Sequence, residues 1–339
     1  MSRYLILQTA FLGDVILTLP LIRLLKDKYP DSKIDFMCIP ETSELLRDNP
    51  LIDEVIVYDK KNSGLIGFFQ IAKNLRNRKY DAIISPHRSF RSAFICSLSG
   101  SKNTISFNKS SMSFLYKHRI KYDASMHEIQ RNISLLQPLG IVTKEIVRPE
   151  IFISQQDIRK IDSIFYGNFI KEEEKIMVIA PGTVWFTKRF PESKFIKLCD
   201  LFASSGIRIF LIGSKKDKVI ADFIVNNSKN KSIINVTGTL TIIESAELIR
   251  RASLLVTNDS APMHIANAVG TNVIAIFGAT VPSFGFYPYG KNDFIFETNG
   301  LKCRPCSIHG GNKCPIKTFD CMNRIDEKEI YNKTREYLC

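Results

Sequence analysis

The stretch that decides the fold is residues 255–278, which read LVTNDSAPMHIANAVGTNVIAIFG. Two apolar runs, Ser253–Thr257 and Asn272–Phe277, have the length and composition of buried β-strands. Between them, Ala261–Val269 has the residue spacing of a helix, and Gly270 suits the end of that helix. A strand, a helix and a second strand in this order predict a parallel βαβ unit.

The same alternation runs along the whole chain and restarts after a linker near Ser154. We therefore predict an α/β protein of two Rossmann-like parallel-sheet domains, residues 1–154 and 155–339, that face one another across a crevice. The other expected strands are Tyr4–Leu7, Ile34–Cys38, Glu54–Val57, Ala82–Ser85, Thr104–Phe107, Glu150–Ile153, Lys175–Ala180, Ile207–Ile212 and Ile233–Val236. The other expected helices are Val15–Lys28, Leu65–Arg78, Phe90–Ser99, His127–Leu139, Asp157–Tyr166, Pro191–Ser204, Asp217–Asn226 and Ile243–Arg251.

The composition is typical of a soluble globular protein, with 45% apolar and 24% charged residues. No window approaches the ~18 consecutive apolar residues that predict a membrane span. The apolar run at the N-terminus breaks at Phe11–Asp14 and is too short for a signal peptide. These features predict a protein that stays in the cytoplasm.

The charge is strongly basic, with 47 Lys and Arg against 34 Asp and Glu and a net charge of +13. Such a balance favours anionic partners, which include nucleic acid, a nucleotide or an anionic membrane surface. No nucleic-acid-binding motif accompanies the charge, so nucleic acid is disfavoured. Between Asp81 and Asp123 there is no acidic residue, while Arg88 and Arg91 lie in that segment. The segment is either a solvated basic face or a positive field for an anionic ligand.

Ligands of parallel α/β sheets bind beyond the carboxyl ends of the strands, so the loops there are the candidate sites. The loop after the first strand ends in Gly13–Asp14. Asp14 can cap the helix that follows, and it can also take a proton from a bound hydroxyl group. The two roles do not exclude one another.

Two loops of the second half carry polar groups of interest. Lys188 and Arg189 lie between the strand Lys175–Ala180 and the next helix, where a basic pair favours an anion such as phosphate. Ser214, which follows the strand Ile207–Ile212, is placed to bond a ribose hydroxyl, although helix capping explains it equally well.

The segment Ser260–His264 opens the helix of the deciding stretch. Ser260 suits the N-cap position, and Pro262 suits the first turn. The free N–H groups of that turn and the helix dipole make an anion site, to which His264 would add a donor. A capped helix whose histidine faces the core is the alternative interpretation.

Three motifs, in order and spanning residues 1 to about 325, resemble those of the heptosyltransferases, glycosyltransferase family 9. Leu12–Leu21 resembles the opening signature of the family, Thr187–Pro191 its central basic motif, and Thr257–His264 its donor-pyrophosphate motif. Phe190 stands where Trp is more usual, and Ala261–Pro262 where many members have Gly-Leu. The chain is most similar to the ADP-heptose:lipopolysaccharide heptosyltransferase II type.

The resemblance implies a GT-B fold and an inverting, metal-independent transfer of heptose from ADP-heptose to the anionic inner core of lipopolysaccharide. By matching positions, Asp14 would be the general base, and Lys188 would neutralise the leaving phosphate. The donor-binding positions would be Thr187, Lys188, Ser214, Leu240, Asp259, Ser260, Ala261, Met263 and His264, with Leu240 against adenine and Ser214 near the ribose. Beyond the motifs, we expect Arg88 and Arg91 to bind the acceptor, and the protein to contact the inner face of the inner membrane peripherally.

Four of the eight cysteines, Cys303, Cys306, Cys314 and Cys321, form a cluster near the C-terminus. Four thiolates suffice for a structural zinc ion, but the spacing lacks the second close pair of a zinc ribbon. We therefore do not favour zinc, and we expect no cofactor.

Three other functions remain open from the sequence. A relative that uses another nucleotide sugar or acceptor would share all three motifs. A nucleotide-sugar epimerase can share the GT-B fold but is not expected to carry the Leu12–Leu21 signature. A binding protein without catalysis is disfavoured because both Asp14 and Lys188 are present.

Overall fold

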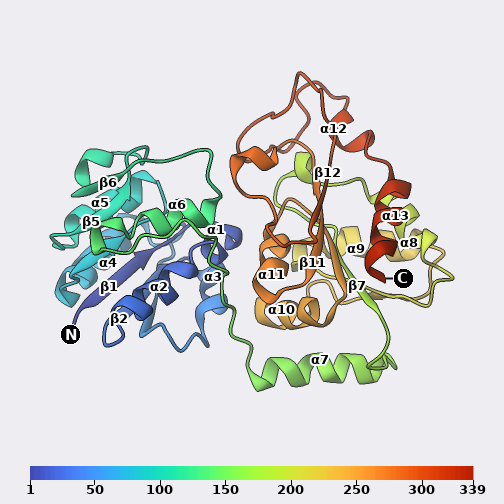
Figure 1. The fold of residues 1–339 in the computed structure, drawn as a ribbon, viewed down its shortest axis with the longest axis horizontal. Coiled ribbons are helices and arrows are strands. Elements are labelled where there is room, and N and C mark those ends of the chain that lie inside the picture. Colours follow the sequence, from blue (N-terminus) through green and yellow to red (C-terminus); the bar gives the residue numbers. More distant parts are fainter. Residues whose placement is uncertain (339) are drawn as a thin grey trace. The chain divides into compact units, whose positions relative to one another are not determined.

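The computed structural model describes residues 1–338 and divides the chain into two units, Met1–Phe152 and a second unit that begins at Ile153 (Figure 1). In the first unit the strands are β1 (Arg3–Leu7), β2 (Lys33–Cys38), β3 (Glu54–Val57), β4 (Ala82–Ile84), β5 (Thr104–Phe107) and β6 (His118–Ile120). Its helices are α1 (Leu12–Ile16), α2 (Pro20–Lys28), α3 (Pro40–Ser43), α4 (Gly64–Arg78), α5 (Phe90–Leu98) and α6 (Glu128–Ser134), with short 3-10 turns at Glu44–Leu46, Ser113–Leu115 and Gln137–Leu139.

The second unit repeats the alternation. Its strands are β7 (Ile176–Ala180), β8 (Arg208–Leu211), β9 (Ile233–Asn235), β10 (Leu254–Asn258), β11 (Asn272–Phe277) and β12 (Phe294–Glu297). Its helices are α7 (Gln155–Gly167), α8 (Glu192–Leu201), α9 (Lys218–Asn227), α10 (Ile242–Arg251), α11 (Ala261–Val269), α12 (Asp320–Asn323) and α13 (Glu327–Leu338), with 3-10 turns η4 (Phe186–Lys188), η5 (Lys215–Asp217) and η6 (Pro282–Phe284).

Each unit contains one six-stranded sheet, and every neighbouring pair of strands is parallel. The orders are β3-β2-β1-β4-β5-β6 and β12-β11-β10-β7-β8-β9, so the first strand of each unit lies near the middle of its sheet. This is the doubly wound arrangement, in which ligands bind where the strand order reverses. The structure therefore confirms the two parallel sheets predicted from the sequence.

The central strands are buried on both faces because helices cover both sides of each sheet. β7 and β10 have no exposed residue, and α8, α9 and α13 pack with them in one apolar core. A separate core of the first unit joins β1 to the inner faces of α4 and α5. These rigid sheets fix the positions of the loops at their carboxyl ends. No helix within residues 1–338 is long and apolar enough to cross a membrane.

Three predicted elements differ from the structure. The helix expected over Val15–Lys28 is split, because Pro20 has no N–H to donate and its ring clashes with the carbonyl one turn earlier. Pro20 instead starts α2, where its missing N–H costs nothing. The helix expected over His127–Leu139 likewise ends at Ser134, before Pro138. The strand expected over Glu150–Ile153 is wrong, because that segment pairs with no sheet.

Candidate functional site

Asp14 lies beyond the carboxyl end of β1, the third residue of the short helix α1. Phe11 holds the N-cap position of that helix, so Asp14 is not the N-cap residue. The side chain is instead in the first turn, where the positive end of the helix favours a carboxylate. Half-buried and at the binding edge of the sheet, it is placed to accept a proton.

The charges of Lys60 and Glu128 both interact with that of Asp14. The Lys60 ammonium donates to the carbonyl of Thr9, 2.6 Å away, and so ties the loop after β1 to the segment before α4. Burial, helped by the nearby Arg91 cation, lowers the pKa of Lys60. Burial is also the main cause that raises the pKa of Glu128 to about 7, and the charge of Asp14 adds to this rise.

His87, in the loop after β4, lies beside Thr9 and near Lys60. Its Nδ1 lies 2.8 Å from the Thr9 hydroxyl and 3.2 Å from that of Ser92. Burial, with the cations Lys60 and Arg88 nearby, lowers the pKa of His87 to about 4, so the ring is neutral at pH 7. Sequence reasoning gave no separate role to Lys60, His87 or Glu128, because only the fold brings them to the Asp14 loop.

Arg88 and Arg91, the expected acceptor ligands, lie beside the same group. The guanidinium of Arg88 stacks 4.4 Å from the ring centre of Tyr122, and its charge acts on both His87 and Glu128. Arg91 is exposed, and it donates to the carbonyl of Lys60 at 2.5 Å. The first unit therefore gathers two acidic side chains, Asp14 and Glu128, and several cations in one group.

In the second unit, Lys188 forms an ion pair with Asp259. The ammonium lies 2.6 Å from Oδ2 of Asp259, and both side chains are largely buried. The same oxygen accepts a hydrogen bond of 2.6 Å from the hydroxyl of Thr280. The basic motif and the Thr257–His264 motif, 71 residues apart at these two positions (259 minus 188), therefore meet in space.

Thr187 is buried beneath a loop that the sequence did not connect with it. Its N–H donates to the carbonyl of Gly311, and the N–H of Gly311 donates back to its hydroxyl at 2.8 Å. Gly310 has a φ of +83°, and a Cβ there would lie only 3.0 Å from Cγ of Lys188. The cysteine-rich loop thus packs against the basic motif, and it needs glycine to do so.

Ser260 occupies the N-cap position of α11, but its side chain does not cap the helix. Its hydroxyl instead donates to the carbonyl of Asn258, 3.3 Å away. Ala261 is half-buried, whereas Met263 and His264 are buried, so only the start of the helix is open to a ligand. The side chain of Asn258 bonds both Pro181 and Phe190, and it fixes the basic loop to the end of β10.

Ser214 and Leu240 lie beyond β8 and β9. Both the N–H and the hydroxyl of Ser214 donate to Oδ2 of Asp217, at 2.8 and 2.6 Å. This is the capping arrangement that the sequence left as an alternative. Leu240 is half-buried just before α10. A Cβ on Gly182 would overlap Oδ1 of Asp217, so this glycine lets the two loops touch.

The thiols of Cys303, Cys306, Cys314 and Cys321 are free and interact electrostatically. Burial, followed by the charges of the other three thiols, raises the pKa of Cys321 to about 11. Within the part of the chain that the structure describes, no three His, Cys, Asp or Glu side chains are grouped as metal ligands.

Comparison with known proteins extends these observations. Residues 68–313 match the family model described as glycosyltransferase family 9 (heptosyltransferase). Lipopolysaccharide heptosyltransferase 3 of Escherichia coli K12 is 30% identical over 86% of this chain and 87% of its own length. Lipooligosaccharide heptosyltransferase 2 of Haemophilus ducreyi is 28% identical over 83% of this chain and 85% of its own.

Two solved structures share the fold. A family 9 glycosyltransferase from Veillonella parvula has a TM-score of 0.87 and 23% identity, with 99% of this chain and 97% of that chain covered. E. coli ADP-heptose lps heptosyltransferase II has a TM-score of 0.81 and 20% identity, with 100% and 98% covered. Both units therefore have the GT-B type of α/β fold found in heptosyltransferases, and the chain belongs to glycosyltransferase family 9, the heptosyltransferase family.

Proposed function

We propose that this protein transfers heptose from ADP-heptose to the inner core of lipopolysaccharide with inversion at the anomeric carbon. The observation that carries the proposal is the Lys188–Asp259 ion pair next to the open start of α11. A lysine fixed beside free helix N–H groups is suited to a pyrophosphate, whose charge grows as the sugar leaves. Curated relatives named as heptosyltransferases support the choice of sugar.

In the proposed reaction, an acceptor hydroxyl oxygen forms a bond to C1 of the heptose as the bond from C1 to the phosphate oxygen breaks. Asp14 takes the proton of that hydroxyl, and ADP leaves with the bonding electron pair. Lys188 and the N–H groups of α11 neutralise the charge that develops on ADP, so the chain's own cations serve the leaving group. The attack comes from the face opposite ADP, which inverts the centre.

For the other donor-binding residues, we retain the roles that the resemblance implies, except for Asp259. A carboxylate repels pyrophosphate, whereas here it accepts from both Lys188 and Thr280. We infer that Asp259 orients Lys188 and does not itself bind the donor. Thr187 anchors the same loop, while Ser260, Ala261, Met263 and His264 shape the start of α11. Ser214 and Leu240 would lie at the ribose and the adenine.

The acceptor side of the proposal rests on charge. The inner core is rich in phosphate and carboxylate, and Arg88 and Arg91 place two guanidinium groups beside the Asp14 group. Since such an acceptor is part of a membrane lipid, the enzyme would work at the inner face of the inner membrane, from the cytoplasmic side.

The first experiment measures ADP release from ADP-heptose with three acceptors: heptose-free Kdo-lipid A, the mono-heptosylated form and the di-heptosylated form. Asp14→Asn is run alongside, because it keeps the shape of the side chain and removes the base. Release with one acceptor that falls at least about a thousandfold in the variant supports the proposal and assigns the step. Absence of release with all three, despite tight ADP binding, overturns it in favour of another sugar, another acceptor or a non-catalytic protein.

A further inference from the structure

The outer face of α4 carries three large apolar side chains at its N-terminal end. Leu65, Ile66 and Phe69 are 78%, 75% and 62% exposed, in a protein whose other apolar residues mostly fill its cores. A different side of the same helix packs into the core through Leu75, with Phe68 and Ile71 beside it. An exposed apolar cluster of this kind marks a surface that meets something less polar than water.

The same outer face becomes basic further along the helix. Lys73 and Arg76 are exposed, and at about 100° per residue they fall in the same sector of about 100° as Leu65, Ile66 and Phe69. From Lys60 to Tyr80 the chain contains six Lys and Arg and no acidic residue. Aromatic and aliphatic residues together with lysine and arginine on one face are typical of helices that lie in the surface of an anionic membrane.

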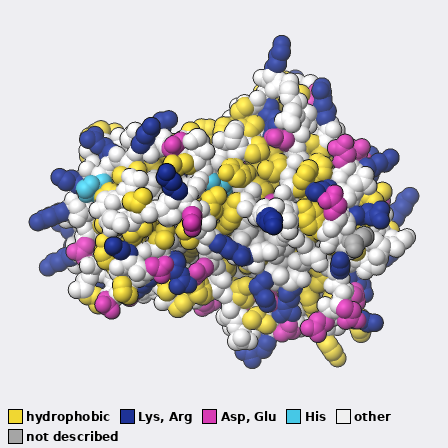
Figure 2. Space-filling view, in the orientation of Figure 1, with side chains coloured by type: hydrophobic (Ala, Val, Ile, Leu, Met, Phe, Trp, Pro, Cys, Tyr) yellow, Lys and Arg dark blue, Asp and Glu magenta, His cyan; other side chains and the backbone are white. Residues whose placement is uncertain are grey.

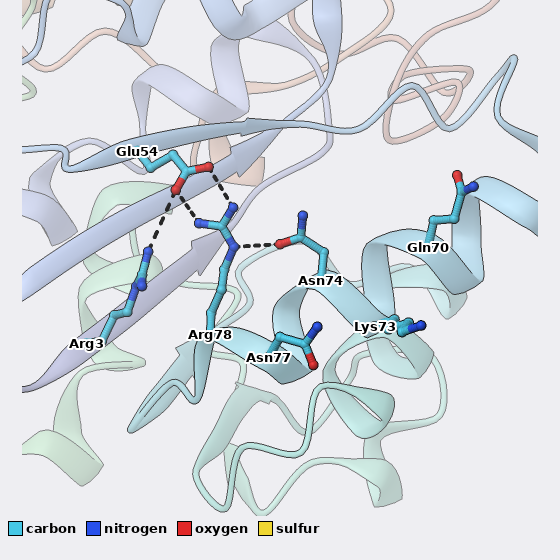
Figure 3. Close-up of a pocket in the computed structure, with 7 residues that line it drawn as sticks. All are labelled: Arg3, Glu54, Gln70, Lys73, Asn74, Asn77 and Arg78. Carbon is cyan, nitrogen blue, oxygen red and sulfur yellow. Dashed lines mark hydrogen bonds and ion pairs between the residues drawn. The ribbon is translucent and has the colours of Figure 1, made fainter.

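A hollow in the first unit separates the cations of this helix by their surroundings. It has a volume of about 660 Å³ and lies at the amino ends of β1 and β3, beside the last turns of α4 (Figure 3). Arg78 points into it and is bound by Glu54, whereas Lys73 extends away from that pair (Figure 3). Arg78 is therefore paired within the protein, whereas Lys73, which also lines the hollow, is exposed and extends outward.

The apolar, N-terminal end of α4 follows β3 and therefore lies at the edge of the sheet formed by the carboxyl ends of the strands. Lys60 and Lys61 lead into this helix, and Lys60 contacts the Thr9 carbonyl of the loop that carries Asp14. Arg91, at the start of α5, donates to Lys60 from the other side. A membrane that received Leu65, Ile66 and Phe69 would therefore lie next to the Asp14 group. Figure 2 shows Lys and Arg side chains over other parts of the surface as well, so charge alone does not select this face.

We propose that the outer face of α4, formed by Leu65, Ile66, Phe69, Lys73 and Arg76, docks the protein on an anionic phospholipid bilayer. The three apolar side chains insert at the level of the headgroups, and the two cations contact lipid phosphates while their stems cover apolar surface. This inference deepens the proposed function and rests on it for its purpose, because docking here brings Asp14 to a membrane-borne acceptor.

The test is flotation of the full chain with vesicles that contain no lipopolysaccharide, so it does not depend on transferase activity. Neutral phosphatidylcholine vesicles are compared with vesicles in which one third of the lipid is phosphatidylglycerol. We expect binding to the anionic vesicles that weakens as salt is raised. The triple variant Leu65→Ser, Ile66→Ser, Phe69→Ser should bind at least about tenfold more weakly. Lys73→Glu with Arg76→Glu should abolish the preference for anionic lipid.

Val219→Ser with Phe223→Ser is the matched control, since these side chains are 78% and 51% exposed on α9 of the other unit. This variant should bind vesicles like the wild type. Equal binding by the wild type and the triple variant overturns the proposal, as does a wild type that floats with neither vesicle. A wild type that is dimeric by sedimentation, ignores vesicles and becomes monomeric in the triple variant also overturns it and assigns the face to a second copy. An unchanged thermal unfolding transition, followed by circular dichroism, shows that the triple variant is folded.

Discussion

The ammonium of Lys188 lies 2.6 Å from Oδ2 of Asp259, and Thr280 donates to the same oxygen. A lysine held in this way keeps its position when the donor arrives, so less side-chain freedom is lost on binding. The carboxylate cancels part of the charge of Lys188 in the resting protein. In the proposed reaction that charge matters most once the leaving phosphate becomes more negative than the bound donor, which would favour the transition state over the ground state.

Lys188→Met should therefore lower kcat by roughly 10²- to 10³-fold, the range found when one stabilising donor is removed from an active site. Asp259→Asn should cost less, because an amide still accepts from Lys188 and Thr280. If Asp259 acts through Lys188, the Asn substitution has no further effect in the Lys188→Met background. Steady-state kinetics of the two single variants and the double variant measure this coupling. Additive losses would instead mean that Asp259 contacts the donor itself.

Charge reversal at Arg88 and Arg91 should weaken binding of the proposed acceptor. Arg88→Glu and Arg91→Glu place negative charge beside the Asp14 group, where the proposed acceptor carries phosphate and carboxylate. We expect the KM for the acceptor to rise about tenfold or more, with little change in the KM for ADP-heptose. Arg119→Glu, in the same acid-free segment but on the edge strand β6, is the control. An acceptor KM that stays the same in both variants would remove these arginines from the acceptor site.

The architecture was predictable because hydrophobic periodicity and helix signals are local. β3 and β11 begin and end at the residues expected from the sequence. The errors also have local causes: Pro20 divides a helix whose apolar spacing continues through it, and the apolar residues near Glu150 pack without a partner strand. The edge strands β6 and β12 were not predicted, because runs of three and four residues are too short to show a clear periodicity.

The sequence could predict site residues that lie within one motif, but not the contacts between residues of different segments. Lys188 and Asp259 came from separate motifs, and nothing in their spacing shows that the two side chains bond. Lys60 and Glu128 reach the Asp14 group, and Thr280 and Gly310 reach the Lys188 loop, by the folding of each unit, so no short stretch of sequence marks them. Gly310 had one faint signal, a Gly-Gly pair inside the cysteine-rich loop.

The neutral His87 predicts a loss of stability in acid. Its folded pKa is about 4, below the ordinary value of 6.5. Between these two values the unfolded chain binds a proton that the folded protein does not, so the free energy of unfolding falls as pH drops from about 6.5 to about 4. His87→Gln removes this proton uptake and should flatten the curve in that window. Urea titrations at a series of pH values measure the slope, and an unchanged slope would show that His87 is protonated in the folded state.

The buried Glu128 predicts a pH dependence of the free energy of unfolding that is opposite in sign to that of His87, over an overlapping pH range. Burial, opposed by the ion pair with Arg131 and helped by the charge of Asp14, raises its pKa to about 7, above the ordinary 4.5. From about pH 4.5 to 7 the folded protein keeps a proton that the unfolded chain has released, so this carboxyl makes the free energy of unfolding fall as pH rises. Glu128→Gln keeps an acceptor for Arg131 and removes the titration, and it should therefore raise stability at pH 7 relative to pH 5. The same urea titrations test this, and His87→Gln serves as the control of opposite sign. If Glu128→Gln leaves the pH dependence unchanged, the Arg131 ion pair holds Glu128 ionised throughout, and the negative charge next to Asp14 persists at every pH at which the enzyme works.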